Sequence, residues 1–121
     1  MTRLSELAQI LVKQPKGILA ADESNSTMDN RLVSIGLEGT AVRRKAWREL
    51  IFSTAGLSEY VSGIIMYDET VRQESQLGQP FVSMLTSFGI VPGIKVDTGT
   101  EHLPESDGEF LTHGFVLQMY V

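Results

Sequence analysis

Three short apolar runs, each ending in charged residues and separated by segments of helical spacing, constrain the fold of this chain more than any other feature. The runs lie at 17–22, 61–67 and 93–97. Apolar runs of this length indicate strands that are buried on both faces. Strands that alternate with helices form parallel sheets through right-handed crossovers. The sequence therefore predicts an α/β fold with about three parallel strands and crossover helices.

The segments between these runs carry the apolar spacing and the boundary residues of helices. They predict four helices, bounded by Leu4 and Pro15, Ser26 and Gly36, Thr40 and Gly56, and Pro80 and Gly89. Ser26 and Thr40 are the expected N-caps, because a hydroxyl can accept a hydrogen bond from a free amide in the first turn. Trp47, Phe81 and Phe88 lie at helical spacing with other apolar residues, so we expect all three in the core.

Charge and composition argue against several kinds of site. The net charge of −5 argues against a nucleic-acid groove, and the one basic cluster, 43–48, is expected to be a solvated helix face. The chain has no cysteine, which excludes thiolate metal sites, and its two histidines, His102 and His113, are too few for a common metal motif and are expected in exposed loops. No stretch approaches the about 20 apolar residues of a membrane span, so we expect a cytoplasmic protein without membrane contact.

Charged residues follow or end all three apolar runs. They are Asp22 and Glu23 at the first run, Asp68 and Glu69 at the second, and Lys95 and Asp97 at the third. The carboxyl ends of parallel strands lie at one edge of a sheet, where α/β proteins bind their ligands. Strand ends also border polar loops, so a single carboxylate would mean little. The same pattern at all three runs favours a ligand site at this edge.

Hydroxyl residues mark a candidate anion site directly after the first run. Ser24, Ser26 and Thr27 lie where a helix begins, and the free amides and the helix dipole at such a position attract phosphate. Arg31 follows about one turn later and could add charge-assisted hydrogen bonds. Ordinary N-capping with an exposed arginine explains the same spacing, and spacing alone favours it. A lone lysine near a strand end is usually a solvated charge, but Lys95 lies between two apolar residues, which raises the chance of a buried functional amine.

Three segments together resemble a known protein family. They are 16–24 (KGILAADES), 63–70 (GIIMYDET) and 92–97 (PGIKVD), and they are similar to the motifs of the first three strands of class I fructose-bisphosphate aldolases. Segments 78–81 and 107–109 match shorter turns of the same family. The resemblance covers about residues 4–114 and implies the N-terminal part of a (β/α)₈ TIM barrel, whose first three strands cannot close the barrel.

The resemblance implies roles for individual residues. Asp22 matches the carboxylate that lies beside the Schiff-base lysine and helps to orient the substrate during carbon–carbon cleavage. The ligands of the substrate's 6-phosphate match three residues, Ser24, Thr27 and Lys95. Glu23 and Arg31 match flanking active-site residues. In the family the iminium-forming lysine lies on a later strand, so we expect no Schiff-base lysine among these residues.

The sequence also departs from the family pattern. Ser26 replaces a glycine that is usual between the phosphate-binding hydroxyls, and Asn30 and Thr98 replace lysines. The family motif does not continue after Gly114, which divides the chain into a partial barrel domain at 1–114 and a divergent apolar tail at 115–121. A complete barrel has about 250 residues, so we expect about half of it or less here, as a truncated fragment that is inactive alone.

The function implied by the resemblance is that of a glycolytic lyase. The family cleaves fructose 1,6-bisphosphate reversibly to dihydroxyacetone phosphate and glyceraldehyde 3-phosphate, through a lysine Schiff base and without a metal ion or other cofactor. Full-length members are expected to be cytoplasmic homotetramers. Two alternatives stay open. One is a non-catalytic interaction protein that uses its open sheet edges or its apolar tail to bind a partner such as full-length aldolase subunits. The other is a self-contained sugar-phosphate binding module.

Overall fold

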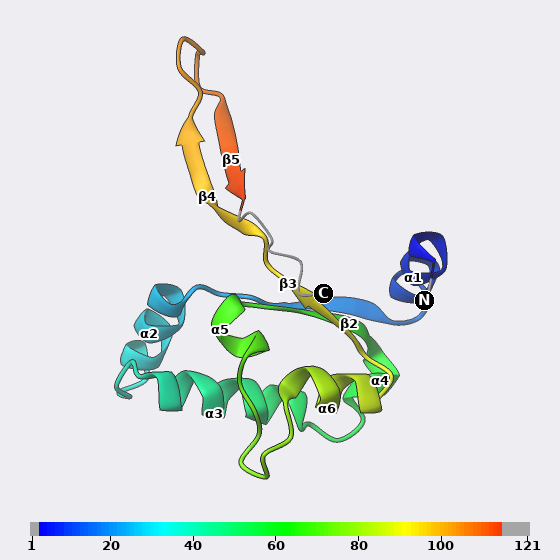
Figure 1. Ribbon diagram of the computed structural model, residues 1–121. Helices are drawn as coiled ribbons and strands as arrows, with labels where there is room; N and C mark the ends of the chain where they lie inside the picture. Colours follow the sequence, from blue (N-terminus) through cyan, green and yellow to red (C-terminus); the bar gives the residue numbers. More distant parts are fainter. Residues whose placement is uncertain (1–2, 115–121) are drawn as a thin grey trace.

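The computed structural model describes residues 3–114, and the tail expected at 115–121 lies outside the described residues. Along the chain the elements are α1 (Leu4–Leu11), β1 (Gly17–Ala21), α2 (Asn25–Ser34), α3 (Ala41–Phe52), α4 (Leu57–Tyr60), β2 (Val61–Met66), α5 (Asp68–Val71), α6 (Phe81–Ser87), β3 (Val91–Ile94), β4 (Asp97–His102) and β5 (Phe110–Gly114) (Figure 1). Within this part of the chain no helix is long and apolar enough to cross a membrane.

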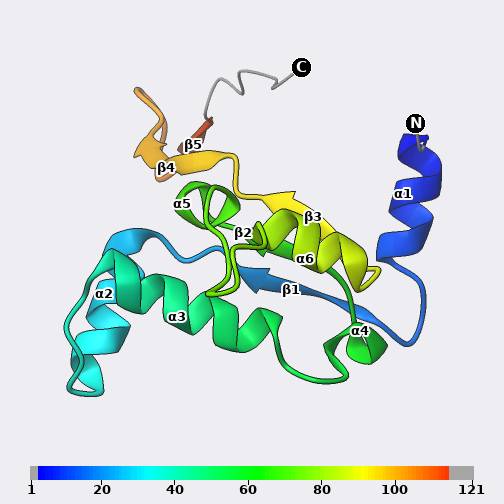
Figure 2. The ribbon, with the colours of Figure 1, turned by 60° about the horizontal axis from the view of Figure 1, so that its bottom comes forward.

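The central feature is a three-stranded parallel sheet with the order β1-β2-β3. The register pairs Ala21 of β1 with Met66 of β2, and Met66 with Ile94 of β3, so the three strands end on one line. Figure 2 shows α2 and α5 leaving from this same edge, where β1 and β2 end. The α/β class, the three parallel strands and the unclosed sheet are therefore confirmed.

Burial differs between the strands because only β2 has a neighbour on both sides among the described residues. The central strand β2 is almost wholly buried, as the sequence predicts. The edge strand β1 is mostly accessible, and Ile18 is 49% exposed. The prediction that the first strand is buried on both faces is wrong, since an apolar sequence does not distinguish an edge strand from a central one.

The core lies between the sheet and the helices α3 and α6 (Figure 1). Its buried members are Ala21, Phe52, Ile64, Met66, Phe81, Met84, Leu85 and Ile90. Phe52 of α3 meets Phe81 of α6 edge to face, with 5.2 Å between the ring centroids, a geometry favoured by the ring quadrupoles. Burying two such rings removes a large apolar area from water and fixes both helices against the sheet.

The expectation of a core position is confirmed for Phe81 and wrong for the other two aromatic residues. Trp47 is 39% exposed and Phe88 is 48% exposed. The inward face of α3 is set by Phe52, and a residue five positions earlier lies about 140° away around the helix axis. Phe88 is the C-cap of α6 and lies just beyond the last residue of that helix.

The third strand and the segment after it differ from the sequence prediction. Strand β3 begins at Val91 and ends at Ile94, so Lys95 lies just past it, and Asp97 begins β4. Strands β4 and β5 pair antiparallel in a hairpin that points away from the sheet (Figure 1). His102 and His113 are exposed, but they lie in these two strands instead of loops. The hairpin has no buried face, so its strands carry no alternation of apolar and polar residues that would predict them.

Candidate functional site

The aligned strand ends bring Asp22 and Lys95 together. Asp22 follows β1 and Lys95 follows β3, with the end of β2 between them. The Lys95 amide donates to the Met66 carbonyl at 2.9 Å, which continues the ladder one residue past β3. The Lys95 ammonium lies 3.8 Å from the Asp22 carboxylate. Two predicted site residues, one from the first strand motif and one from the third, therefore lie at one edge of the sheet.

Lys95 also contacts a second carboxylate, that of Asp97. Its Nζ atom lies 2.7 Å from Oδ1 of Asp97. The hydrogen bond to Asp97 raises the pKa of Lys95, burial opposes the increase, and the charges of Asp97 and Asp22 add to it. The same hydrogen bond lowers the pKa of Asp97. Lys95 is therefore a protonated cation near neutral pH, which suits anion binding and not nucleophilic attack.

The hydroxyl cluster lies at the first turn of α2. Ser24 is the N-cap, and its Oγ accepts a hydrogen bond from the Thr27 amide at 3.3 Å. The same oxygen lies 3.0 Å from the hydroxyl of Thr27 and 3.1 Å from that of Ser26. The predicted cap, Ser26, is wrong by two residues, because the link after β1 is short and α2 already begins at Asn25. Three hydroxyls therefore gather where the helix dipole is positive.

The Glu23 carboxylate is bound by two arginines. Arg48 of α3 is 2% exposed; it donates to the Glu23 carboxylate at 2.6 Å and to the Glu23 carbonyl oxygen at 3.1 Å. Arg31 donates to the other carboxylate oxygen. Burial raises the pKa of Glu23, but the hydrogen bond and charge of Arg48 and the charge of Arg31 outweigh it and lower the pKa. Glu23 thus ties α3 and α2 to the turn between Asp22 and Ser24.

A second arginine of α3 binds two further carboxylates. Arg44 donates to Asp29 of α2 at 2.7 Å and to both carboxylate oxygens of Glu69 at 2.8 Å. The hydrogen bond to Glu69 raises the pKa of Arg44, burial opposes it, and Asp29 adds to the increase. Asp68 is held by Arg72 at 2.9 Å. Asp68 and Glu69 are therefore both paired with arginines, and Arg44 links α2 and α3 to the segment after β2.

The expectation that the basic cluster 43–48 is a solvated helix face is wrong for Arg44 and Arg48. These two residues are four positions apart, so they lie on one face of α3. That spacing, together with carboxylates at 23 and 69 after two strands, is the signal that sequence reasoning missed. Arginine is rarely buried without a partner, so a basic cluster on a helix by itself predicts surface exposure.

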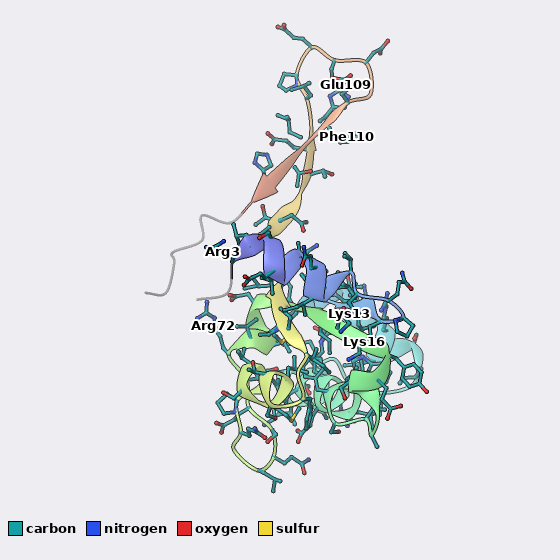
Figure 3. The ribbon with its side chains drawn as sticks, turned by 90° about the vertical axis from the view of Figure 1, so that its right-hand side faces the viewer. Arg3, Lys13, Lys16, Arg72, Glu109 and Phe110 are labelled. Atoms are coloured by element: carbon teal, nitrogen blue, oxygen red, sulfur yellow. The ribbon has the colours of Figure 1, made fainter. Side chains whose placement is uncertain are left out.

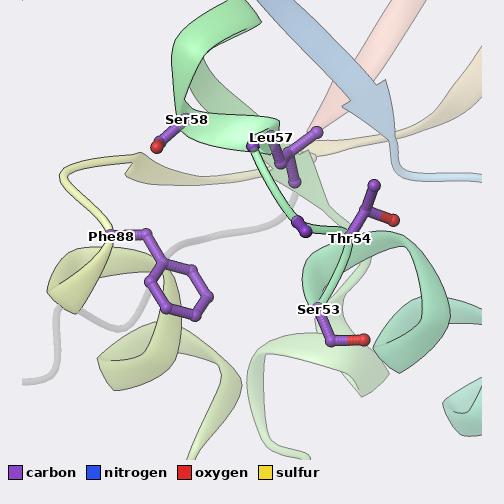
Figure 4. Close-up of a pocket in the computed structure, with 7 residues that line it drawn as sticks. Ser53, Thr54, Leu57, Ser58 and Phe88 are labelled. Atoms are coloured by element: carbon purple, nitrogen blue, oxygen red, sulfur yellow. The ribbon is translucent and has the colours of Figure 1, made fainter.

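A small pocket lies at the other end of the molecule from the aligned strand ends. It has a volume of about 130 Å³ and is lined by the end of α3, the start of α4 and Phe88 (Figure 4). Its lining holds the hydroxyls of Ser53, Thr54 and Ser58 but no charged side chain. Within residues 3–114 no group of three or more acidic, histidine or cysteine side chains is arranged to hold a metal ion.

Comparison with known proteins gives consistent matches. The family model described as fructose-bisphosphate aldolase class-I matches residues 3–118. A probable fructose-bisphosphate aldolase class 1 of Xanthomonas axonopodis pv. citri is 47% identical over 93% of this chain and 34% of its own length. Fructose-bisphosphate aldolase 1 of Toxoplasma gondii is 50% identical over 92% of this chain and 31% of its own. The chain spans about a third of the length of these relatives.

A solved structure agrees with the sequence matches. The fructose-bisphosphate aldolase of Plasmodium falciparum, in complex with TRAP and a small-molecule inhibitor, superposes with a TM-score of 0.84 at 45% identity. The match covers 89% of this chain and 31% of that one.

The first testable consequence of the site geometry concerns the buried arginine. We expect Arg48→Met to lower the free energy of unfolding by about 3 kcal/mol, because it leaves the partly buried Glu23 carboxylate without its buried partner and with only the exposed Arg31. The matched control is Arg43→Met on the exposed side of the same helix, which we expect to change it by no more than about 0.5 kcal/mol. Urea unfolding followed by circular dichroism measures both. Equal effects of the two substitutions would contradict the role of Arg48.

Proposed function

The chain belongs to the class I fructose-bisphosphate aldolase family, a family of lyases, and we propose on that premise that it carries the part of the active site that binds one phosphate group of fructose 1,6-bisphosphate. The observation that carries the proposal is the 3.8 Å contact between Lys95 and Asp22. It places a cation from one strand end beside the carboxylate that precedes the hydroxyl cluster of Ser24 and Thr27.

The proposed ligand is a sugar phosphate because the groups at this edge match the chemistry of a phosphate. The ammonium of Lys95 supplies positive charge, and the hydroxyls of Ser24 and Thr27 can donate hydrogen bonds to phosphate oxygens. The N-terminus of α2 adds free amides and the positive end of the helix dipole. The Thr27 amide donates a hydrogen bond to the Ser24 hydroxyl at 3.3 Å, so these two residues already lie close together. A bound phosphate would accept hydrogen bonds from both of them.

Asp22 is the proposed catalytic residue of this edge. Its carboxylate would orient the substrate beside the Schiff-base lysine of the complete protein during carbon–carbon cleavage. Glu23 and Arg31, proposed as flanking residues, bind each other, so their role is to hold the turn that carries Asp22 and Ser24. In the complete protein we propose reversible cleavage of fructose 1,6-bisphosphate to dihydroxyacetone phosphate and glyceraldehyde 3-phosphate, as a cytoplasmic, homotetrameric enzyme of glycolysis with a barrel fold.

Binding tests the proposal most simply. We expect weak affinity of this chain for fructose 1,6-bisphosphate, which falls as salt increases and falls about tenfold further in Lys95→Ala, because a charge-assisted contact to the phosphate is lost. The matched control is Lys13→Ala, since Lys13 lies with Lys16 before the start of β1, away from Arg72 and the strand ends (Figure 3). Isothermal titration calorimetry at low salt measures the three affinities. An affinity that survives Lys95→Ala unchanged would remove Lys95 from the site.

Covalent trapping tests the separate expectation that these residues hold no Schiff-base lysine. A class I mechanism needs an amine with a lowered pKa, whereas Asp97 raises the pKa of Lys95. Lys13 and Lys16 lie away from the site, and Lys45 lies on α3. We expect no stoichiometric adduct when the 121-residue chain is treated with borohydride and dihydroxyacetone phosphate. Intact mass spectrometry decides the matter, and one adduct per chain would show the expectation to be wrong.

A further inference from the structure

The charge around Lys95 is unfavourable for an incoming anion. Its ammonium is shared by two carboxylates, that of Asp97 at 2.7 Å and that of Asp22 at 3.8 Å. Two negative groups on one cation leave this cluster with a net negative charge, and all three side chains are partly open to solvent. A phosphate dianion that approaches the cluster is repelled by the pair of carboxylates as well as attracted by the lysine.

The neighbouring arginines do not offset the net negative charge around Lys95. Arg31 and Arg48 are bound by Glu23, and Arg44 is bound by Asp29 and Glu69. The charge of each of these arginines is paired with a carboxylate, and Arg44 and Arg48 are largely shielded from solvent. Lys95 is therefore the partly exposed cation beside Asp22, and a ligand gains its charge once its present partner releases it.

Asp97 is the nearer of the two partners, and the backbone explains why. Strand β3 ends at Ile94 and β4 begins at Asp97, so only two residues separate the strands. Residues two positions apart in an extended segment project to the same side. The carboxylate of Asp97 is therefore held beside the Lys95 ammonium by the chain itself, at a separation typical of a charge-assisted hydrogen bond.

We propose that Asp97 is an internal competitor for Lys95, which occupies the place of the substrate phosphate and lowers the affinity of the site for phosphorylated ligands. The proposal rests on the proposed function, in which Lys95 binds phosphate. A ligand must displace the Asp97 carboxylate before it gains the lysine, so a dianionic phosphate competes better than a singly charged anion. Asp97 thus sets both the strength and the selectivity of binding. Removing its charge strengthens binding, whereas removing a residue that contacts the ligand weakens it.

The test is the substitution Asp97→Asn, which keeps the side-chain shape and removes the competing charge. Affinity for fructose 1,6-bisphosphate, measured by isothermal titration calorimetry at low salt, increases about two- to fivefold, the range expected for release of an exposed ion pair. The control Asp107→Asn removes the same charge in the β4–β5 loop and leaves the affinity unchanged. In the Lys95→Ala background Asp97→Asn gives a smaller increase, because it relieves only the repulsion by Asp97 and frees no cation. An increase as large as in the presence of Lys95 would overturn the competitor role.

The outcomes separate this inference from the proposed function. If Lys95→Ala weakens binding but Asp97→Asn does not strengthen it, the competitor role is wrong and the phosphate site stands. If neither substitution changes binding, the phosphate site itself is wrong. Circular dichroism confirms that the variants are folded, and Asp97→Ser provides a second charge-removing variant. Loss of folding in both Asp97 variants would assign Asp97 a structural role and overturn the proposal.

Discussion

The parallel pairing of β2 with both of its neighbours is the constraint on which the rest of the structure depends. Its register aligns Ala21, Met66 and Ile94, so that the residues following β1 and β3 meet at one edge. A slip of one residue in either pairing would turn the side chains to the opposite face and separate Lys95 from Asp22. The aromatic contact between α3 and α6 holds this register by covering the same sheet face.

Helix α3 contributes to the site although none of its residues is proposed to touch the ligand. Arg48 brings a buried charge to the turn after β1, where Glu23 neutralises it. Burying a charge is costly unless its partner is well placed, so the pair fixes where this turn can lie. Arg44 does the same for the segment after β2 through Glu69. Arg44 and Arg48 are thus shielded within ion pairs, whereas Lys95 keeps access to solvent and can exchange partners.

Much of the fold could be predicted from the sequence, because apolar spacing reports directly on strand and helix periods. The central strand, the start of α3 at Thr40 and the end of α6 before Gly89 follow from such local signals. Features that depend on distant partners could not be predicted. The exposure of β1, the burial of Arg48 and the cap at Ser24 are each decided by what lies across the fold, and the β4–β5 hairpin has no apolar face to reveal it. The candidate site residues come from the sequence motifs, but the contact between Lys95 and Asp97 is visible only in the structure.

The central claim is that two distant segments form one anion site, and nuclear magnetic resonance of the ¹⁵N-labelled chain titrated with inorganic phosphate tests it most directly. We expect the amide signals of Asn25, Ser26 and Thr27, in the first turn of α2, to shift together with that of Lys95. All should follow one dissociation constant, while the loop between β4 and β5 stays unchanged. Shifts of the α2 amides without Lys95, or separate dissociation constants for the two segments, would contradict it.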